Sequence, residues 1–300
     1  MGVDAAVEPV VERTVRPVTG TEYLHLATQL LQTARRASAT GGVWEAADLQ
    51  WWWRRDQHPD PNGQTFWFVN GVPTAAVVLM NWGDRWQGDL LSADPHDSAW
   101  LDEVWSKALE QFRTLSANPV ELILRSDDRA LIDLAKDAGF ETDGGEGTTA
   151  WMEAAERPTV PHLLPDFVLT DRTEVTNRPH PFVRRNGGTV TERLAECSLY
   201  RPSLDLAIYA PNGDAGAYGL FWADPITRVG LVEPMRTEAA YQGLGLARHL
   251  LAVGLDRLAR SGCSRLKVSF DPLYEPARRL YLDAGFQTVS TTRTYVRDLS

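Results

Sequence analysis

Short apolar runs, typical of strands, alternate along the chain with stretches that place apolar residues three or four positions apart, as amphipathic helices do. In the first half, turn signals at Asn70-Gly71 and Gly83-Asp84 predict an antiparallel meander. The strands expected in this half cover residues 13–17, 65–69, 74–80, 86–91, 120–124 and 148–152, the last as the second strand of a hairpin. Helices are expected from Thr21, from Ser98 and from Asp128, the last ending at Gly139.

The second half repeats this order of elements. The expected strands cover residues 167–170, 204–210, 215–222, 228–237, 265–270 and 291–296, and the expected helices cover 192–198, the run after Gly245, and 275–284. A helix ends at Ala138-Gly139-Phe140 in one half and at Ala284-Gly285-Phe286 in the other, a period of about 146 residues. The sequence therefore predicts an α+β chain of two tandem domains, each a mostly antiparallel twisted sheet flanked by helices.

Proline content sets the expected boundary between the two copies. Pro158, Pro161 and Pro165 fall close together, so we expect a linker over residues 153–165. This places a loose tail at residues 1–12, a first domain at 13–152 and a second domain at 166–300.

Charge and tryptophan also divide the chain. Residues 1–155 carry 24 acidic and 12 basic side chains, whereas residues 156–300 carry 16 and 18. An acidic first half argues against nucleic acid as a partner, and the mildly basic second half permits a polyanionic ligand. Ten of the 11 tryptophans precede residue 152. The adjacent Trp51, Trp52 and Trp53 cannot all face one core, so they either pack between domains or form a substrate wall.

Apolar runs, cysteines and histidines bear on where the protein is located and whether it binds a metal. No apolar run approaches the roughly 18 residues of a membrane span, and Met1–Ala5 does not read as a secretory signal. Cys197 and Cys263 form no disulfide framework, and the histidines have no metal-ligand spacing. We expect a cytoplasmic protein without a metal or a membrane partner. The sequence does not determine its oligomeric state.

One turn in the second half stands out. Gly243 and Gly245 precede an amphipathic run, where small residues let the backbone turn tightly and present free N–H groups to phosphate oxygens. A glycine-containing helix start without a ligand is the simplest alternative. A dinucleotide fingerprint is another, but it needs a third small residue where Arg248 stands.

Two motifs together point to a family. Gln242-x-x-Gly245-x-Ala247 opens a helix, and Ala277-x-x-Leu280-Tyr281-x-x-x-Gly285-Phe286 follows about thirty residues later. This pair resembles the GCN5-related N-acetyltransferase (GNAT) superfamily, in which the first motif is the phosphate turn. The resemblance is sharp over residues 204–297 and weaker over 166–203. Over residues 13–152 it holds only in element order and in the Gly-Phe ending.

The resemblance implies a coenzyme A site and a set of roles. Backbone N–H groups of the turn would hold the pyrophosphate, the strand around Arg236 would pair with the pantetheine arm, and Tyr281 would protonate the departing thiolate. A carboxylate two residues from the position of Glu233 acts as general base in some members, which makes Glu233 a candidate here; a structural carboxylate paired with Arg236 is the alternative. The cofactor-binding residues that this implies are Met235, Arg236, Thr237, Gln242, Gly243, Leu244, Gly245, Leu246, Ala247 and Asp271.

Departures from the family pattern affect both halves. Asp271 stands where the family often has asparagine, which puts one coenzyme contact in doubt. Where the phosphate turn should repeat in the first half, residues 92–98 contain no Gly-x-Gly, and Ala135 takes the place of Tyr281. The first copy is therefore interpreted as a degenerate domain without coenzyme, acting either as a substrate wall or as a structural partner.

The function implied is transfer of an acetyl group from acetyl-CoA directly to an amine of a small molecule or peptide. Mycothiol synthase has a similar tandem plan, but no residue here demands that chemistry. A non-catalytic protein that senses acyl-CoA, or a scaffold, is the alternative from another class.

Overall fold

The computed structural model describes residues 11–54, 63–94, 100–115 and 118–298. The expected tail up to residue 10, the helix start at Ser98 and most of the 92–98 segment lie outside these ranges. First-half strands are β1 (Arg13–Val18), β2 (Gln64–Val69), β3 (Val72–Asn81), β4 (Trp86–Ser92), β5 (Val120–Arg125) and β6 (Glu141–Glu153). Second-half strands are β7 (Val168–Asp171), β8 (Asp205–Tyr209), β9 (Ala215–Ala223), β10 (Val229–Thr237), β11 (Arg265–Phe270) and β12 (Gln287–Arg297).

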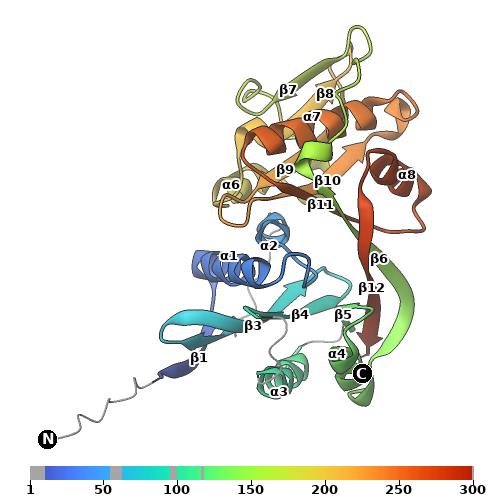
Figure 1. Cartoon of the computed structure of the whole chain (residues 1–300). Coiled ribbons are helices and arrows are strands. Elements are labelled where there is room, and N and C mark those ends of the chain that lie inside the picture. The colour runs from blue at the N-terminus through green and yellow to red at the C-terminus, as the bar shows by residue number, and fades with distance from the viewer. Residues whose placement is uncertain (1–10, 55–62, 95–99, 116–117, 299–300) are drawn as a thin grey trace, which may run out of the picture.

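Helices cover both faces of the sheet (Figure 1). In the first half they are α1 (Gly20–Ala37), α2 (Ala46–Trp52), α3 (Leu101–Phe112) and α4 (Arg129–Asp137). In the second half they are α5 (Val183–Asn186), α6 (Val190–Ala195), α7 (Leu246–Arg260) and α8 (Glu275–Asp283). The Asp128 carboxylate accepts a hydrogen bond from the Leu131 N–H, and Gly139 ends α4 with a φ of +84°, so both predicted ends of this helix are confirmed.

The described strands form one sheet in the order β1-β2-β3-β4-β5-β12-β6-β11-β10-β9-β8-β7. The last strand of each half has crossed to the other half: β12 pairs with β5, and β6 pairs with β11, both antiparallel. Figure 1 shows β6 and β12 running side by side between the two ends of the molecule, and they pair with each other as well. β6 and β12 therefore each have a partner strand on both sides.

This exchange overturns one local prediction. Residues 141–153 form one 13-residue strand rather than a hairpin whose second strand starts at 148. β12 supplies partners on both sides of a register shift between Arg293 and Tyr295, from Glu141 and Thr142 to Glu146 and beyond, and Gly147 lies opposite Thr292. Tertiary pairing thus outweighs the local turn signal. The helix expected at 192–198 lies earlier, at Val190–Ala195, and the short helix α5 was missed.

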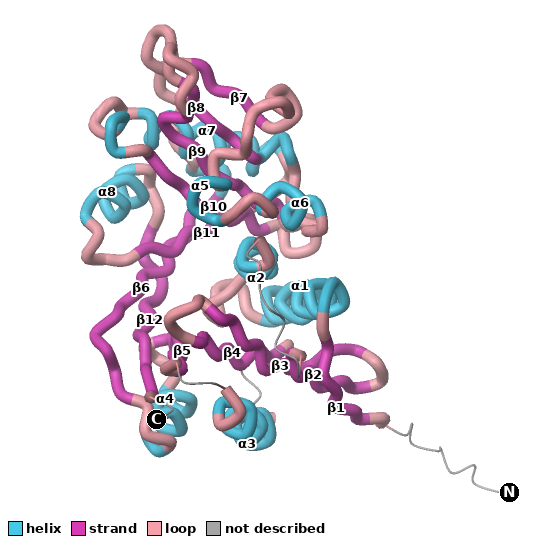
Figure 2. The backbone as a smooth tube through the Cα atoms, turned by 180° about the vertical axis from the view of Figure 1, so that it is seen from behind, coloured by secondary structure: helices cyan, strands magenta, loops and turns pink. Residues whose placement is uncertain are grey.

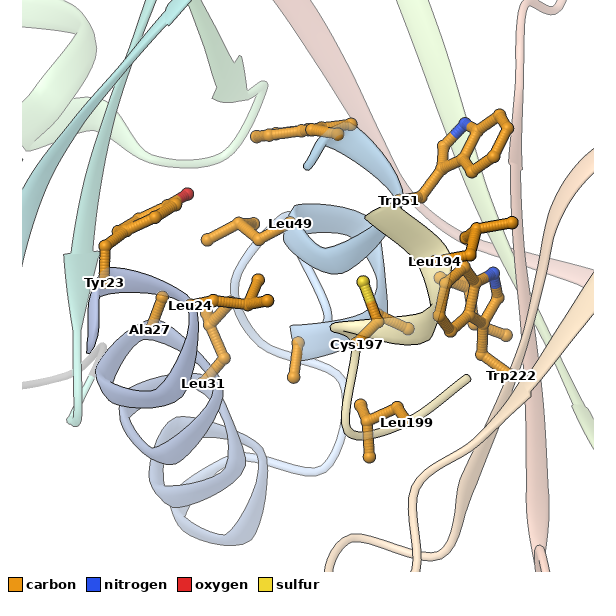
Figure 3. Close-up of a cluster of buried hydrophobic side chains, with 14 of the residues drawn as sticks. Tyr23, Leu24, Ala27, Leu31, Leu49, Trp51, Leu194, Cys197, Leu199 and Trp222 are labelled. Atoms are coloured by element: carbon orange, nitrogen blue, oxygen red, sulfur yellow. The ribbon is translucent and has the colours of Figure 1, made fainter. Parts of the chain in front are cut away.

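A hydrophobic cluster joins the two halves. It contains residues of α1, α2, β2 and β3 together with residues of α6, β8 and β9. From behind, α1 and α2 lie between the two parts of the sheet (Figure 2). Figure 3 shows side chains of both halves packed in this cluster: Tyr23, Leu24, Ala27, Leu31, Leu49, Trp51, Leu194, Cys197, Leu199 and Trp222. The first half therefore covers one face of the second half's sheet.

Polar contacts fix this packing. The fully buried Gln50 amide donates to Ser198 Oγ and accepts the Leu199 N–H, both at 2.9 Å. Lys267 of β11 is 1% exposed and donates to Glu45 Oε1 at 3.0 Å, at the start of α2. Such satisfied buried polar groups specify one arrangement of the halves. No helix in the described ranges is long and apolar enough to span a membrane.

Candidate active site

The site lies where two neighbouring strands of the second half separate. In the described structure β10 and β11 pair in parallel only from Val229 to Leu231. The register between β10 and β9 then shifts between Val232 and Met235, so the bulge expected at Pro234 is confirmed. Met235, Arg236 and Thr237 pair with β9 on one side only. Their other edge is open to an extended ligand that pairs as a strand.

The turn after β10 presents free backbone donors. Gly243 and Gly245 both have φ of +76°, and the segment from Gln242 to Gly245 is exposed. Within the described residues, no acceptor bonds the N–H groups from Gly243 to Ala247. They lie at the N-terminus of the 15-residue helix α7, where the helix dipole favours an anion. The glycines serve the backbone conformation, because an added Cβ would meet no atom within 4 Å.

Glu233 lies on β10 just beyond Leu231, where the pairing of β10 with β11 stops. It is partly buried, and among the described residues no side-chain hydrogen bond or ion pair reaches it. Arg236, the arginine expected to pair with Glu233 if its carboxylate were structural, instead places its Nε 3.6 Å from Glu238 Oε1. Burial and, to a smaller extent, the charge of Asp48 raise the pKa of Glu233 to about 8, against a lowering effect of Arg54. A carboxyl group with such a pKa is suited to proton transfer near neutral pH.

Tyr281 on α8 is buried between aromatic rings. Its ring centroid lies 5.5 Å from that of Phe270 and 6.1 Å from that of Phe286. Burial raises its pKa above the usual value, and the negative charge of Glu233 adds to this increase. The hydroxyl therefore stays protonated through neutral and mildly alkaline pH, which a proton donor requires.

Two further groups come from the first half. Asp48 and Arg54, in and just after α2, act electrostatically on Glu233, and α2 packs against β10. Asp48 also accepts the Glu45 N–H at 2.7 Å, as part of a capping box. Sequence analysis missed both residues because no local motif marks them. Only the packing of α2 on the second half brings them to the site.

Other predicted residues occupy different surroundings. The Asp271 carboxylate accepts a hydrogen bond from the Leu273 N–H at 2.8 Å and so stabilises the turn that follows β11.

Trp51 and Trp52 are 3% and 7% exposed inside the shared cluster, and Trp53 donates to Glu196 Oε2. Packing between the halves, one of the two alternatives for these indoles, is what the structure shows; burial leaves Trp51 and Trp52 little surface for a substrate. The described residues contain no group of three or more His, Cys, Asp or Glu placed to hold a metal ion.

Comparison with known proteins agrees with this geometry. Residues 167–286 match the sequence model of the acetyltransferase (GNAT) family. No curated protein sequence matches the chain. Most of the second half therefore matches the GNAT acetyltransferase family, a family that uses acetyl-CoA.

Solved structures extend the likeness to the whole chain. A tandem GNAT protein from the clavulanic acid biosynthesis pathway, solved without AcCoA, is 13% identical, with a TM-score of 0.70 over 96% of this chain and 99% of that one. A GCN5-related N-acetyltransferase from Sphaerobacter thermophilus is 15% identical, with a TM-score of 0.61 over 96% of each chain. A GNAT-family acetyltransferase from Colwellia psychrerythraea is 14% identical, with a TM-score of 0.58 over 95% and 99%. The predicted fold class, a tandem GNAT fold, is confirmed. The similarity in plan to mycothiol synthase stays a prediction.

Proposed function

We propose that the second half binds acetyl-CoA and transfers its acetyl group directly to the amine of a small molecule or peptide. The observation that carries this proposal is the run of free N–H groups from Gly243 to Ala247, beside strands that separate at Glu233. Phosphate oxygens of the coenzyme accept hydrogen bonds from the turn. The open edge of β10 over Met235–Thr237 pairs with the extended pantetheine arm.

In this reaction the chain's own groups hold the donor and move two protons. Glu233, or a water molecule bound to it, accepts one proton from the ammonium group; the neutral amine nitrogen then forms the new bond to the acyl carbon and loses a second proton to solvent. A backbone N–H of β10 donates to the carbonyl oxygen as negative charge develops there. As the carbon–sulfur bond breaks, Tyr281 donates its proton to the sulfur and is later reprotonated from solvent. The products are an amide and a free thiol.

The coenzyme site is tested by isothermal titration with acetyl-CoA. Gly245→Glu places a carboxylate where phosphate binds, and we expect at least a tenfold loss of affinity. Gly71→Glu is the matched control, because Gly71 has the same φ of +76° and equally open surroundings, but lies in a first-half hairpin turn. Both variants should lose similar thermal stability. Equal acetyl-CoA affinity in the Gly245→Glu variant and the wild type would remove the turn from the site.

A second assay separates transfer from sensing. Amines and short peptides are incubated with acetyl-CoA, and free thiol is followed over time. Amine-dependent thiol release is the expected result. If acetyl-CoA binds but no amine is acetylated, the chain is an acyl-CoA-binding protein without transferase activity.

A further inference from the structure

A cavity of about 640 Å³ lies in the first half, and all of its lining residues come from that half. It lies where β4 and β5 separate, since in the described structure these strands pair in parallel only at Trp86↔Val120 and Gln87↔Glu121. The end of α1 with its following loop and the first residues of α3 and α4 complete the walls. In element order this is the counterpart of the place where β10 and β11 separate in the second half. The first half, although it lacks the glycine turn, has therefore kept an open space there.

Asp89 on β4 gives this cavity its distinctive chemistry. The side chain is 5% exposed and lines the cavity. One carboxylate oxygen accepts the Trp44 Nε1–H at 2.7 Å, and the other accepts from Gln87 Nε2 at 2.8 Å. Within the described residues no lysine or arginine forms an ion pair with it. Two neutral donors thus hold a buried carboxylate in place and leave its charge unbalanced, which is costly without a cation.

The other charged groups of the wall are already matched. Arg35 donates to both carboxylate oxygens of Glu45, and Arg125 donates to both oxygens of Asp127 at 2.9 and 2.7 Å. Asp128, also in the wall, caps the N-terminus of α4. No cation of the described wall is left over to balance Asp89. A cation that balances the ionised form of Asp89 would therefore come from outside the wall.

The rest of the wall is largely apolar and aromatic. Trp44 and Trp100 line the cavity together with the leucines at 31, 91, 101, 124 and 131. The faces of tryptophan rings attract cations, and the leucines favour an apolar body. The buried Nε1–H of Trp100 has no acceptor among the described residues, so it remains available to a polar atom of a ligand.

We propose that this first-half cavity binds an amphipathic organic cation, a primary or secondary ammonium group on an aromatic or aliphatic body, with Asp89 as its counter-ion. The site is separate from the coenzyme site of the second half and does not depend on the function proposed for it. The first half, which lacks the glycine turn, would then bind a ligand at a site of its own.

The proposal also predicts how binding depends on pH. Burial, together with the charges of Glu121 of β5 and Asp48 of α2, raises the pKa of Asp89 to about 7, and the hydrogen bonds from Trp44 and Gln87 oppose part of this increase. From α1, Arg35 is paired with Glu45 and Tyr23 is neutral. An ammonium ligand needs the ionised carboxylate. Its affinity should therefore fall about tenfold per pH unit below about pH 7 and level off above pH 8.

The experiment is calorimetric titration of the full chain with tryptamine, at pH 6, 7 and 8. Indole-3-ethanol and indole-3-propionate serve as neutral and anionic ligands of the same shape. We expect saturable binding of tryptamine alone, at least tenfold weaker in Asp89→Asn and with the pH dependence removed in that variant. Asp84→Asn is the matched control, because Asp84 is an exposed aspartate outside the cavity wall. Asp89→Asn should not unfold the protein, since it removes a buried charge.

Any one of the following results would overturn the proposal. One is the absence of saturable tryptamine binding to the wild type up to millimolar concentration. The second is equal binding by the neutral alcohol, or equal tryptamine affinity in Asp89→Asn and the wild type. The third is loss of tryptamine binding in Glu233→Gln with retention in Asp89→Asn, because this would place the amine in the second half's site.

Discussion

Replacing Glu233 by glutamine should lower activity and raise stability at alkaline pH, and this opposite pair of effects tests its role as general base. The substitution keeps the shape of the side chain but removes its charge and its capacity to accept a proton. Because its carboxylate has no hydrogen bond or ion pair among the described residues, the change breaks no contact there. Loss of a general base typically lowers the rate by about 10²- to 10⁴-fold.

The stability effect follows from the raised pKa. The pKa of Glu233 is about 8 in the folded protein against a usual value of 4.5, and one pKa unit corresponds to about 1.36 kcal/mol. The folded state holds the proton more tightly than the unfolded state does, so the neutral form contributes stability at low pH. This contribution is lost as the pH rises from about 4.5 through about 8, by at most about 5 kcal/mol. The Gln variant lacks this loss and should be the more stable protein at pH 9, with little difference at pH 4.5.

The assay measures kcat/KM for amine acetylation from pH 6 to 9.5, and thermal unfolding over the same range. In the wild type, kcat/KM should rise with pH as Glu233 loses its proton and should level off above about pH 8. In Glu233→Gln this rise should be absent. Glu192→Gln, at an exposed position on α6, is the control for removing a carboxylate. A Gln variant with unchanged kcat/KM and an unchanged pH profile would refute the assignment of Glu233 as base.

Three further predictions concern the proton donor, the packing of α7 and the contact between the halves. Tyr281→Phe should lower kcat at least 10²-fold while acetyl-CoA affinity by titration stays within about threefold; an unchanged kcat would move the acid role elsewhere. Gly254→Ala should cost about 1–3 kcal/mol in urea unfolding, because its added Cβ would lie 2.0 Å from the Phe221 ring; unchanged stability would contradict this packing. Lys267→Met should cost about 1–3 kcal/mol, since it removes one of the two buried partners of Glu45 while Arg35 remains; a loss below 1 kcal/mol would show that this contact does not hold the halves together.

Much of the candidate site could be predicted because its residues are close in sequence. The Gly243–Ala247 turn and the Tyr281 helix are short segments whose conformation depends on glycine φ angles and helix periodicity, both visible locally. The bulge at Pro234 has a similar local cause. Asp48 and Arg54 could not be predicted, because their proximity to Glu233 depends on how α2 packs on β10.

The sequence by itself determined most of the order of elements, the duplication and the glycine turn of the second half, since strand and helix periods and turn residues act over a few positions. Only the tertiary structure decided that β6 and β12 exchange places between the halves, that residues 141–153 form one strand, and that Trp51 and Trp52 pack inside the shared cluster. Strand pairing and core packing join residues far apart in the chain, and many partners satisfy the same local pattern. The cavity at Asp89 has the same origin, because its walls come from three helices, two strands and the loop after α1.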